Sequence, residues 1–224
     1  MLQHTSNPQR EACDFCDEFA GGHRNAYVDR YGNSARRIIM GSPQFRIVPT
    51  LGQIVEGHLL IVPKVHCCAL ADLPGEQISE FSSLHRKVRS ILESTYDQCV
   101  CFEHGVRNAG DGGCGIDHAH LHAVPVAAEG VLATLEQEFQ GTRIDSFETI
   151  THVVPEGSSY LFFEDASGAR LVFPASKLPS QYMRKLVAES IGKSVWDWRN
   201  SRCERELIAT IQTLSPLFTR APVE

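Results

Sequence analysis

The chain has 224 residues, a formal net charge of −6 and 42% apolar side chains. That length supplies a core for one large domain, or for one domain with an appendage, and the acidic balance disfavours nonspecific binding to nucleic acids or anionic membranes. Because no apolar run approaches the ~18 residues of a membrane span and residues 1–7 carry no secretory signal, we expect a cytoplasmic protein with no membrane partner and no nucleic-acid partner.

Eight cysteines raise the question of disulfides. The adjacent pair at residues 67 and 68 and the pair at 99 and 101 are not spaced like a secreted disulfide scaffold. We therefore expect reduced thiols and one metal-binding pair, as is usual in a reducing compartment.

The first half of the chain predicts a meander of strands followed by one long helix. Short apolar segments separated by turn residues indicate strands at 26–28, 37–40, 45–48 and 58–62. Apolar side chains then recur at helical spacing through residues 76–96. A strand at 99–103 follows, and we expect it to pair with a strand at 116–124.

A glycine-rich loop lies between these last two strands, at residues 108–117. Glycine permits positive φ angles and lets backbone N–H groups cluster around an anion. A plain hairpin turn is the alternative, but the histidines that follow favour phosphate binding. The candidate substrate-binding residues of this loop are Asn108, Gly113, Cys114 and Gly115.

Three histidines, His118, His120 and His122, are separated by single apolar residues. In an extended strand alternate side chains share one face at spacings of roughly 6.6 Å, so the three imidazoles line one wall. The other face carries the apolar residues Ala119, Leu121 and Ala123. The alternatives are an exposed polar strand face or a simple metal-binding tract, and the neighbouring glycine loop favours a chemical role.

These residues resemble the signature of the histidine triad (HIT) superfamily, His-φ-His-φ-His-φ-φ preceded by an Asn-x-Gly loop. Residues 57–66 look like the strand that leads into the Pro-Lys-x-His turn of that superfamily, and Cys13 and Cys16 match the Cys-x-x-Cys of many bacterial members. The resemblance covers roughly residues 10–130. It implies an α+β, HIT-like fold, in which a domain at 1–143 has an antiparallel sheet and a long packed helix.

The resemblance also implies catalytic roles for the triad. A neutral imidazole is nucleophilic when one nitrogen is bare and the other is held by an acceptor. By resemblance, His120 attacks the α-phosphorus of a nucleotide ester or amide and forms a nucleotidyl-imidazole. The backbone carbonyl of His118 accepts a hydrogen bond from the other ring nitrogen, and His122 reaches the phosphate or the bridging atom.

A structural zinc ion is the cofactor that the resemblance implies. Tetrahedral zinc requires four ligands, and Cys-x-x-Cys supplies two of them. Related proteins complete the site with a histidine from the Pro-Lys-x-His region and the first triad histidine. Carried over, the ligand set is Cys13, Cys16, His66 and His118. Members of the superfamily are often dimers, so the resemblance also implies a homodimer.

Residues 144–224 form a smaller α+β C-terminal extension. We expect strands at 147–154, 160–164 and 170–173 and helices at 181–191 and 204–214. The extension is either a lid that contacts substrate or a docking or dimer element. Its candidates for phosphate or base contacts are Lys177, Gln181, Arg184 and Lys185, against the alternative of a solvated helix face, and Trp196 and Trp198 are expected to be packing residues.

The leading functional hypothesis is a hydrolase that cleaves a nucleoside phosphoramidate or a dinucleoside polyphosphate through a covalent nucleotidyl-histidine. The alternatives are a nucleotidyl- or phosphoryltransferase with a specialised substrate and a noncatalytic nucleotide-binding protein. Two departures from the superfamily bear on the substrate. Gly113-Cys114-Gly115 replaces a Gly-Gln-Ser segment, and the carboxylate that often binds ribose hydroxyls aligns near Thr50.

Overall fold

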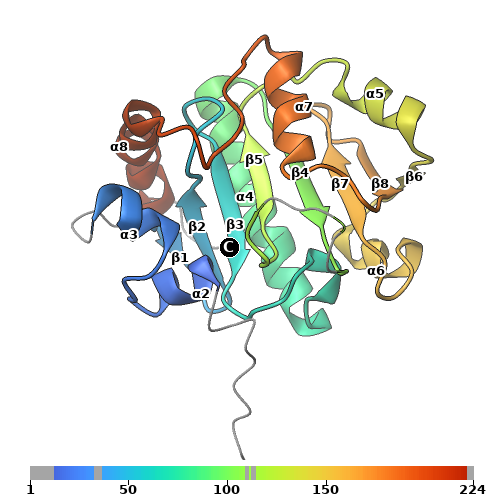
Figure 1. The fold of residues 1–224 in the computed structure, drawn as a ribbon, viewed down its shortest axis with the longest axis horizontal. Coiled ribbons are helices and arrows are strands. Elements are labelled where there is room, and N and C mark those ends of the chain that lie inside the picture. The colour runs from blue at the N-terminus through green and yellow to red at the C-terminus, as the bar shows by residue number, and fades with distance from the viewer. Residues whose placement is uncertain (1–12, 33–36, 109–110, 112–114, 221–224) are drawn as a thin grey trace, which may run out of the picture.

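Eight strands form one antiparallel sheet in the order β1-β2-β3-β5-β4-β7-β8-β6 (Figure 1). The computed structural model describes residues 13–32, 37–108, 111 and 115–220. The strands are β1 (Met40–Gly41), β2 (Phe45–Pro49), β3 (Leu59–Pro63), β4 (Val100–Gly105), β5 (Leu121–Val124), β6 (Thr142–Arg143), β7 (Tyr160–Glu164) and β8 (Arg170–Pro174).

Helices cover both faces of this sheet, with α4 behind it and α7 in front in the view of Figure 1. The helices are α2 (Asp14–Phe19), α3 (Ala26–Tyr31), α4 (Gly75–Tyr96), α5 (Val131–Glu138), α6 (Ile150–Val153), α7 (Tyr182–Ser190) and α8 (Glu204–Arg220), with 3-10 turns η1 (Leu70–Asp72) and η2 (Phe147–Thr149). The predicted α+β fold with a long packed helix is therefore confirmed.

Double-sided burial explains why the central strands are apolar throughout. All five residues of β3 and of β7 are buried. On one face Phe81 of α4 packs with Ile61 and Leu121, and on the other Val187 of α7 packs with Phe102. A sheet that is covered on both faces requires apolar side chains at successive positions.

The strand that carries the third triad histidine occupies the middle of the sheet. β5 pairs with β3 on one side and with β4 on the other, which confirms the predicted pairing across the glycine loop. In this register His122 lies between Leu60 and Phe102. The apolar residues that alternate with the histidines, Ala119, Leu121 and Ala123, join the core on the α4 face, as predicted.

Strands from both sides of residue 143 contribute to this sheet. β7 pairs with β4 through five residue pairs, and β8 pairs with β7. The division into residues 1–143 and 144–224 stays a prediction, but the extension shares the sheet and its core with the first part of the chain.

Two predicted strands are wrong because the local sequence favours helix. Residues 26–28 belong to α3, whose first turn is capped by Asn25: the backbone N–H of Val28 donates to its side-chain oxygen at 3.0 Å. Residues 147–154 form η2 and α6 instead of a strand. Their buried side chains, Phe147, Ile150 and Val154, recur at helical spacing.

Two further strands are shorter than predicted. The first, expected at 37–40, is β1 at Met40–Gly41, and the second, expected at 116–124, is β5 at Leu121–Val124. Before β5 the chain leaves the ladder, because the N–H of Ala119 donates to the carbonyl of Cys67 at 2.7 Å. His118 and His120 therefore precede the strand, and only His122 lies within it.

None of the helices in the described ranges is long and apolar enough to cross a membrane. The seven cysteines within those ranges are all free thiols.

A buried ion-pair network connects α4 to β7. His85 Nε2 lies 2.5 Å from a carboxylate oxygen of Glu164, whose other oxygen accepts from Arg170 Nε at 3.0 Å and lies 3.3 Å from Arg89 Nη1. Burial opposes a charge on His85, but its contacts with Cys101 and Glu164 raise its pKa to about 9. The charged state of each group in this network is therefore stabilised by the opposite charge of its partners.

Replacing Glu164→Gln should lower the free energy of unfolding by about 3–5 kcal/mol, because it leaves the buried His85 and the partly buried Arg89 and Arg170 without their carboxylate. Urea unfolding at pH 7, followed by circular dichroism, measures this loss. Glu93→Gln is the matched control, because Glu93 also accepts from Arg89 but is 37% exposed; its loss should stay within about 1 kcal/mol. Equal losses in the two variants would contradict a dominant role for the buried network.

Candidate functional site

The three triad histidines are almost fully buried, with exposures of 2% for His118, 7% for His120 and 2% for His122. The rings of His120 and His122 have centroids 4.9 Å apart, and the ring of His122 stacks on Phe102 at 4.4 Å. His120 and His122 line a common cavity, whereas His118 faces two cysteines. The triad therefore divides into a cavity pair and one residue beside the thiols.

A backbone carbonyl fixes the proton on His120. Nδ1 of His120 lies 2.6 Å from the carbonyl oxygen of His118, and a carbonyl only accepts, so Nδ1 carries the proton and Nε2 is the bare nitrogen. Burial lowers the pKa of His120 to about 4, and the positive charges of Arg184 and Arg37 act in the same direction. His120 is therefore a neutral imidazole with a nucleophilic nitrogen at physiological pH.

A fourth histidine, His58, completes this group. Its Nε2 lies 2.8 Å from His122 Nδ1, and one of the two nitrogens donates to the other. Within the described residues, the remaining nitrogens, His58 Nδ1 and His122 Nε2, are buried without a hydrogen-bond partner. Sequence reasoning placed His58 only at the start of a strand. The signal that identifies it is the register: Leu60 lies opposite His122, and His58 is two residues from Leu60 on the same face.

The cavity beside His120 is small, and two arginines, Arg37 and Arg184, lie in its wall. Its volume is about 20 Å³, which suffices for a water molecule. Its lining comes from α2, the segments around β1, β2 and β3, the segment that carries the triad and the C-terminal extension: Phe15, Arg37, Thr50, Leu51, Leu60, Ile116, His120, His122, Arg184 and Trp198.

The candidates from the extension occupy different places. Arg184 is 1% exposed and lines the cavity, so for this residue the solvated helix face is wrong. Lys177 and Lys185 are exposed, and Lys185 lies 3.7 Å from Glu189. Trp198 is 9% exposed and Trp196 packs on the α7 side of the core, so both take part in packing.

Gln181 uses its polar atoms within the protein. Its side-chain N–H donates to Asp197 at 2.7 Å, and its oxygen accepts from the N–H of Trp198 at 3.0 Å. Gln181 thus attaches the segment around Trp198 to α7, and it is not among the described residues that line the cavity. Its predicted substrate contact stays a prediction.

The glycine loop is described only in part. Asn108 is exposed, and its side-chain N–H donates to the carbonyl of Gly157 at 2.7 Å. Gly115 has a φ of +91°, and its carbonyl accepts from Arg199 at 3.3 Å. Neither residue is among the described residues that line the cavity, and Gly113 and Cys114 lie outside the described ranges.

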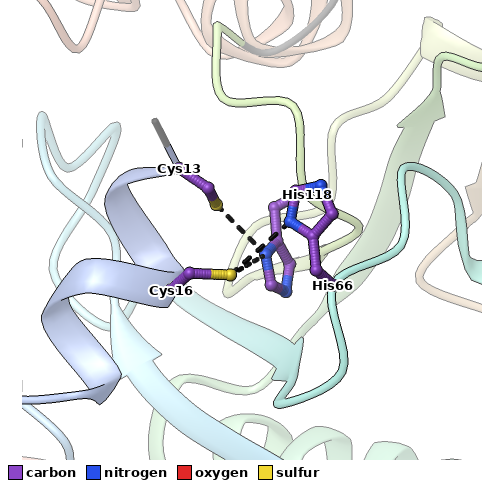
Figure 2. Close-up of side chains that lie close together, drawn as sticks. All are labelled: Cys13, Cys16, His66 and His118. Carbon is purple, nitrogen blue, oxygen red and sulfur yellow. Dashed lines mark hydrogen bonds between the residues drawn. The ribbon is translucent and has the colours of Figure 1, made fainter. Parts of the chain in front are cut away.

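The four predicted metal ligands come together (Figure 2). Cys13 and Cys16 come from the start of α2, His66 follows β3, and His118 precedes β5. The sulfur of Cys13 lies 3.3 Å from His118 Nδ1, and that of Cys16 lies 3.5 Å from His66 Nδ1 and 3.7 Å from His118 Nδ1. Zinc with ordinary Zn–S and Zn–N bond lengths places sulfur and nitrogen ligands about 3.6 Å apart in a tetrahedron. The cluster therefore has the dimensions of a tetrahedral metal site.

The surroundings orient His118 for such a site. Its Nε2 donates to the carbonyl of Pro63 at 2.8 Å, so its Nδ1 presents a lone pair toward the two sulfurs. Burial raises the pKa of Cys13 to about 12, so the thiol stays protonated unless a cation replaces the proton. These contacts fit a closed metal site in which His118 is a ligand through Nδ1.

Comparisons with known proteins give related but distant matches. A protein family described as "Protein similar to CwfJ C-terminal" matches residues 31–140, just under half of the chain. CWF19-like protein 1 of Pongo abelii is 22% identical over 169 residues, which cover 69% of this chain and 30% of that protein. The chain thus spans about 30% of the length of this curated relative.

Two further proteins are similar over shorter segments or in fold. The bis(5'-nucleosyl)-tetraphosphatase (asymmetrical) of Schizosaccharomyces pombe is 27% identical over 75 residues, which cover 34% of this chain and 41% of that protein. A Zn-bound histidine triad family protein from Mycobacterium smegmatis has a TM-score of 0.37 and 22% identity, with 52% of this chain and 76% of that chain covered. The family match covers just under half of the chain, and the bacterial type predicted from the sequence stays a prediction.

The buried histidine pair predicts a specific response to pH. Burial, followed by the positive charge of neighbouring groups including Arg184, lowers the pKa values of His58 and His122 well below 6.5. Nitrogen-15 chemical shifts of labelled histidine should show both rings uncharged well below pH 6.5, whereas in urea-unfolded protein they titrate near 6.5.

Below pH 6.5 the two histidines bind protons in the unfolded chain but stay uncharged in the folded protein. Protonation therefore favours the unfolded chain, and the free energy of unfolding should fall as the pH drops below 6.5. Titration of His58 or His122 near pH 6.5 in the native protein would contradict this assignment.

Proposed function

We propose that this protein is a nucleotide hydrolase that acts on a nucleoside phosphoramidate or a dinucleoside polyphosphate through a covalent nucleotidyl-histidine. The observation that carries the proposal is the hydrogen bond from His120 Nδ1 to the carbonyl of His118, which leaves Nε2 as a bare nitrogen. A binding protein has no need of such a nucleophile. The similarity to a yeast protein named as a bis(5'-nucleosyl)-tetraphosphatase supports the dinucleoside polyphosphate as substrate class.

The chemistry proceeds in two displacements at phosphorus. In the first, His120 Nε2 attacks the α-phosphorus, a P–N bond forms, and the bond to the leaving group breaks with its electron pair. A polyphosphate leaves as its anion, and an amine leaves with a proton taken from His122 or from solvent. In the second, water attacks the same phosphorus and the P–N bond to His120 breaks, which releases a nucleoside monophosphate and a proton. The hydrogen bond from His120 Nδ1–H to the His118 carbonyl persists through both steps and stabilises the charged imidazole of the intermediate.

His122 has the position of a group that contacts the phosphate. It lines the cavity next to His120, and its Nδ1 is paired with His58. If His58 donates that hydrogen bond, Nε2 of His122 carries a proton and can donate to a phosphate oxygen or to the leaving atom. If His122 donates, its Nε2 accepts instead. His58 is a positioning residue in either case.

The alternative within the same site is a nucleotidyl- or phosphoryltransferase. It uses the same His120 intermediate but transfers the group to an acceptor other than water.

Zinc is the metal that we propose for Cys13, Cys16, His66 and His118. Two sulfurs and two imidazole nitrogens at tetrahedral spacing form a donor set that zinc prefers. With four protein ligands the ion would be structural, and it would hold His118, whose carbonyl binds His120, in place.

A small-molecule nucleotide partner, a homodimer and a cytoplasmic location complete the proposal. The free cysteines of the described ranges support a reducing compartment.

Metal analysis tests the zinc site. Purified protein should contain about one zinc ion per chain by inductively coupled plasma mass spectrometry, and Cys16→Ala should lower the zinc content to below about 0.2 per chain. Cys203→Ala is the control, because Cys203 is also a free cysteine but lies outside the cluster. A wild-type zinc content near zero after gentle purification would refute the site.

Intact-protein mass tests the covalent step. Wild type and His122→Ala are incubated with nucleoside phosphoramidates, dinucleoside polyphosphates and nucleotide sugars, and we expect a nucleotidyl adduct that maps to His120. His120→Ala should form no adduct and lose about 10³-fold or more of the rate, as expected for a removed nucleophile. His152→Ala is the control because it removes an exposed histidine, and it should leave the adduct at His120 and the rate unchanged.

An adduct that hydrolyses in water alone indicates a hydrolase, and one that persists until an acceptor is added indicates a transferase. The absence of any adduct and any turnover across this panel would favour the noncatalytic nucleotide-binding protein.

A further inference from the structure

Arg184 is a charged residue of the extension that the fold carries to the histidine cavity. It lies in the first turn of α7 and is 1% exposed, although Arg is rarely buried to this degree. Its side chain lines the same cavity as His120 and His122. In Figure 1, α7 stands in front of the sheet beside the upper end of β5. The extension thus supplies part of the wall that faces the nucleophile.

Backbone and hydroxyl oxygens hold the guanidinium of Arg184 in a fixed orientation. Its Nε donates to the carbonyl of Trp196 at 2.8 Å, and Nη2 donates to the carbonyl of Gly52. Nη1 is 3.4 Å from the hydroxyl oxygen of Thr50, a long hydrogen bond to another residue of the cavity wall. These three acceptors fix the orientation of the guanidinium.

Arg37, the other arginine of the cavity, has a different environment. Its guanidinium forms two hydrogen bonds with the carboxylate of Glu18, at 2.8 Å and 2.6 Å, and a third with the carbonyl of Pro49 at 2.7 Å. Its charge is therefore balanced within the protein. Among the described residues that line the cavity there is no carboxylate, and Arg184 places a guanidinium in the same wall as His120 and His122.

This arrangement suits a phosphate. Phosphoryl transfer places negative charge on the nonbridging oxygens, and catalysis depends on groups that neutralise it without moving. A planar guanidinium presents paired N–H donors that match phosphate oxygens, and in a desolvated site such a contact is stronger than in water. A phosphate oxygen also offers Nη1 a better acceptor than the distant Thr50 hydroxyl.

We propose that Arg184 is a catalytic residue that binds the nonbridging oxygens of the phosphate attacked by His120. The inference rests on the proposed function and adds to it: the C-terminal extension supplies the cation of the active site. Phosphorylated ligands are then selected over their nucleosides by a residue that lies 64 positions after the nucleophile.

Comparing each nucleoside monophosphate with its nucleoside distinguishes phosphate binding by Arg184 from a purely structural role of this residue. Binding of AMP, GMP, CMP and UMP is compared with binding of the corresponding nucleosides by isothermal titration calorimetry, for wild type and Arg184→Gln. We expect the affinity for the monophosphates to fall at least about tenfold and the affinity for the nucleosides to stay within about twofold. Equal losses for both ligands would show that Arg184 only maintains the cavity wall and would overturn the proposal.

Two further variants keep the test decisive. Arg184→Lys retains the charge but not the paired donors, and serves if Arg184→Gln fails to fold; it should bind monophosphates but lose about 10²-fold or more in kcat. Lys185→Gln removes a neighbouring exposed charge of α7 and should match wild type in every assay. An Arg184→Lys enzyme with wild-type kcat and KM, or a Lys185→Gln variant with the same losses as Arg184→Gln, would overturn the proposal.

The outcomes distinguish this inference from the proposed function. If wild type forms the His120 adduct and Arg184→Gln retains its kcat/KM, the proposed function stands and the role of Arg184 is refuted. If wild type forms no adduct but its preference for monophosphates over nucleosides depends on Arg184, the hydrolase is refuted and the phosphate-binding role stands. If wild type shows no such preference, the role of Arg184 is refuted in either case.

Discussion

The hydrogen bond from His120 to the carbonyl of His118 connects the two parts of the site. The carbonyl of His118 sets the protonation of the cavity histidine, while its side chain lies between Pro63 and the two cysteines. The position of that carbonyl therefore depends on the contacts of the His118 ring. A metal at the cysteines would act on the cavity without touching it, because it would fix the residue whose backbone holds the imidazole of His120.

Burial is the second constraint, and it accounts for the chemistry of the cavity. The sheet is covered on both faces, so His58 and His122 lie in surroundings where a charged imidazole is unfavourable. They remain neutral and bond to each other. The fold thereby provides uncharged imidazoles at physiological pH, and two arginines from opposite ends of the chain lie in the same cavity wall.

Much of the fold follows from short-range patterns, and the misses have physical causes. The helical spacing of 76–96, the alternation around the triad and the pairing of β4 with β5 are visible in the sequence because each depends on residues that lie close together in the chain. Residues 26–28 are apolar enough for a strand, but the capping side chain of Asn25 starts a helix there. In the site, the triad and the four metal-ligand candidates were predictable from local motifs. The burial of Arg184 was not, because it depends on the packing of α7 over a sheet formed by distant residues.

The attachment of α7 has a consequence for the kinetics of the protein. Gln181 binds the segment around Trp198, Arg184 binds Gly52, and the enclosed volume admits little more than a water molecule. A nucleotide is far larger than this space, so the wall of the cavity must widen around a bound ligand. The apparent affinity is then the intrinsic affinity reduced by the fraction of molecules that are open. Capture and release of ligand then depend on this widening of the cavity wall, and the chemical step need not set the overall turnover.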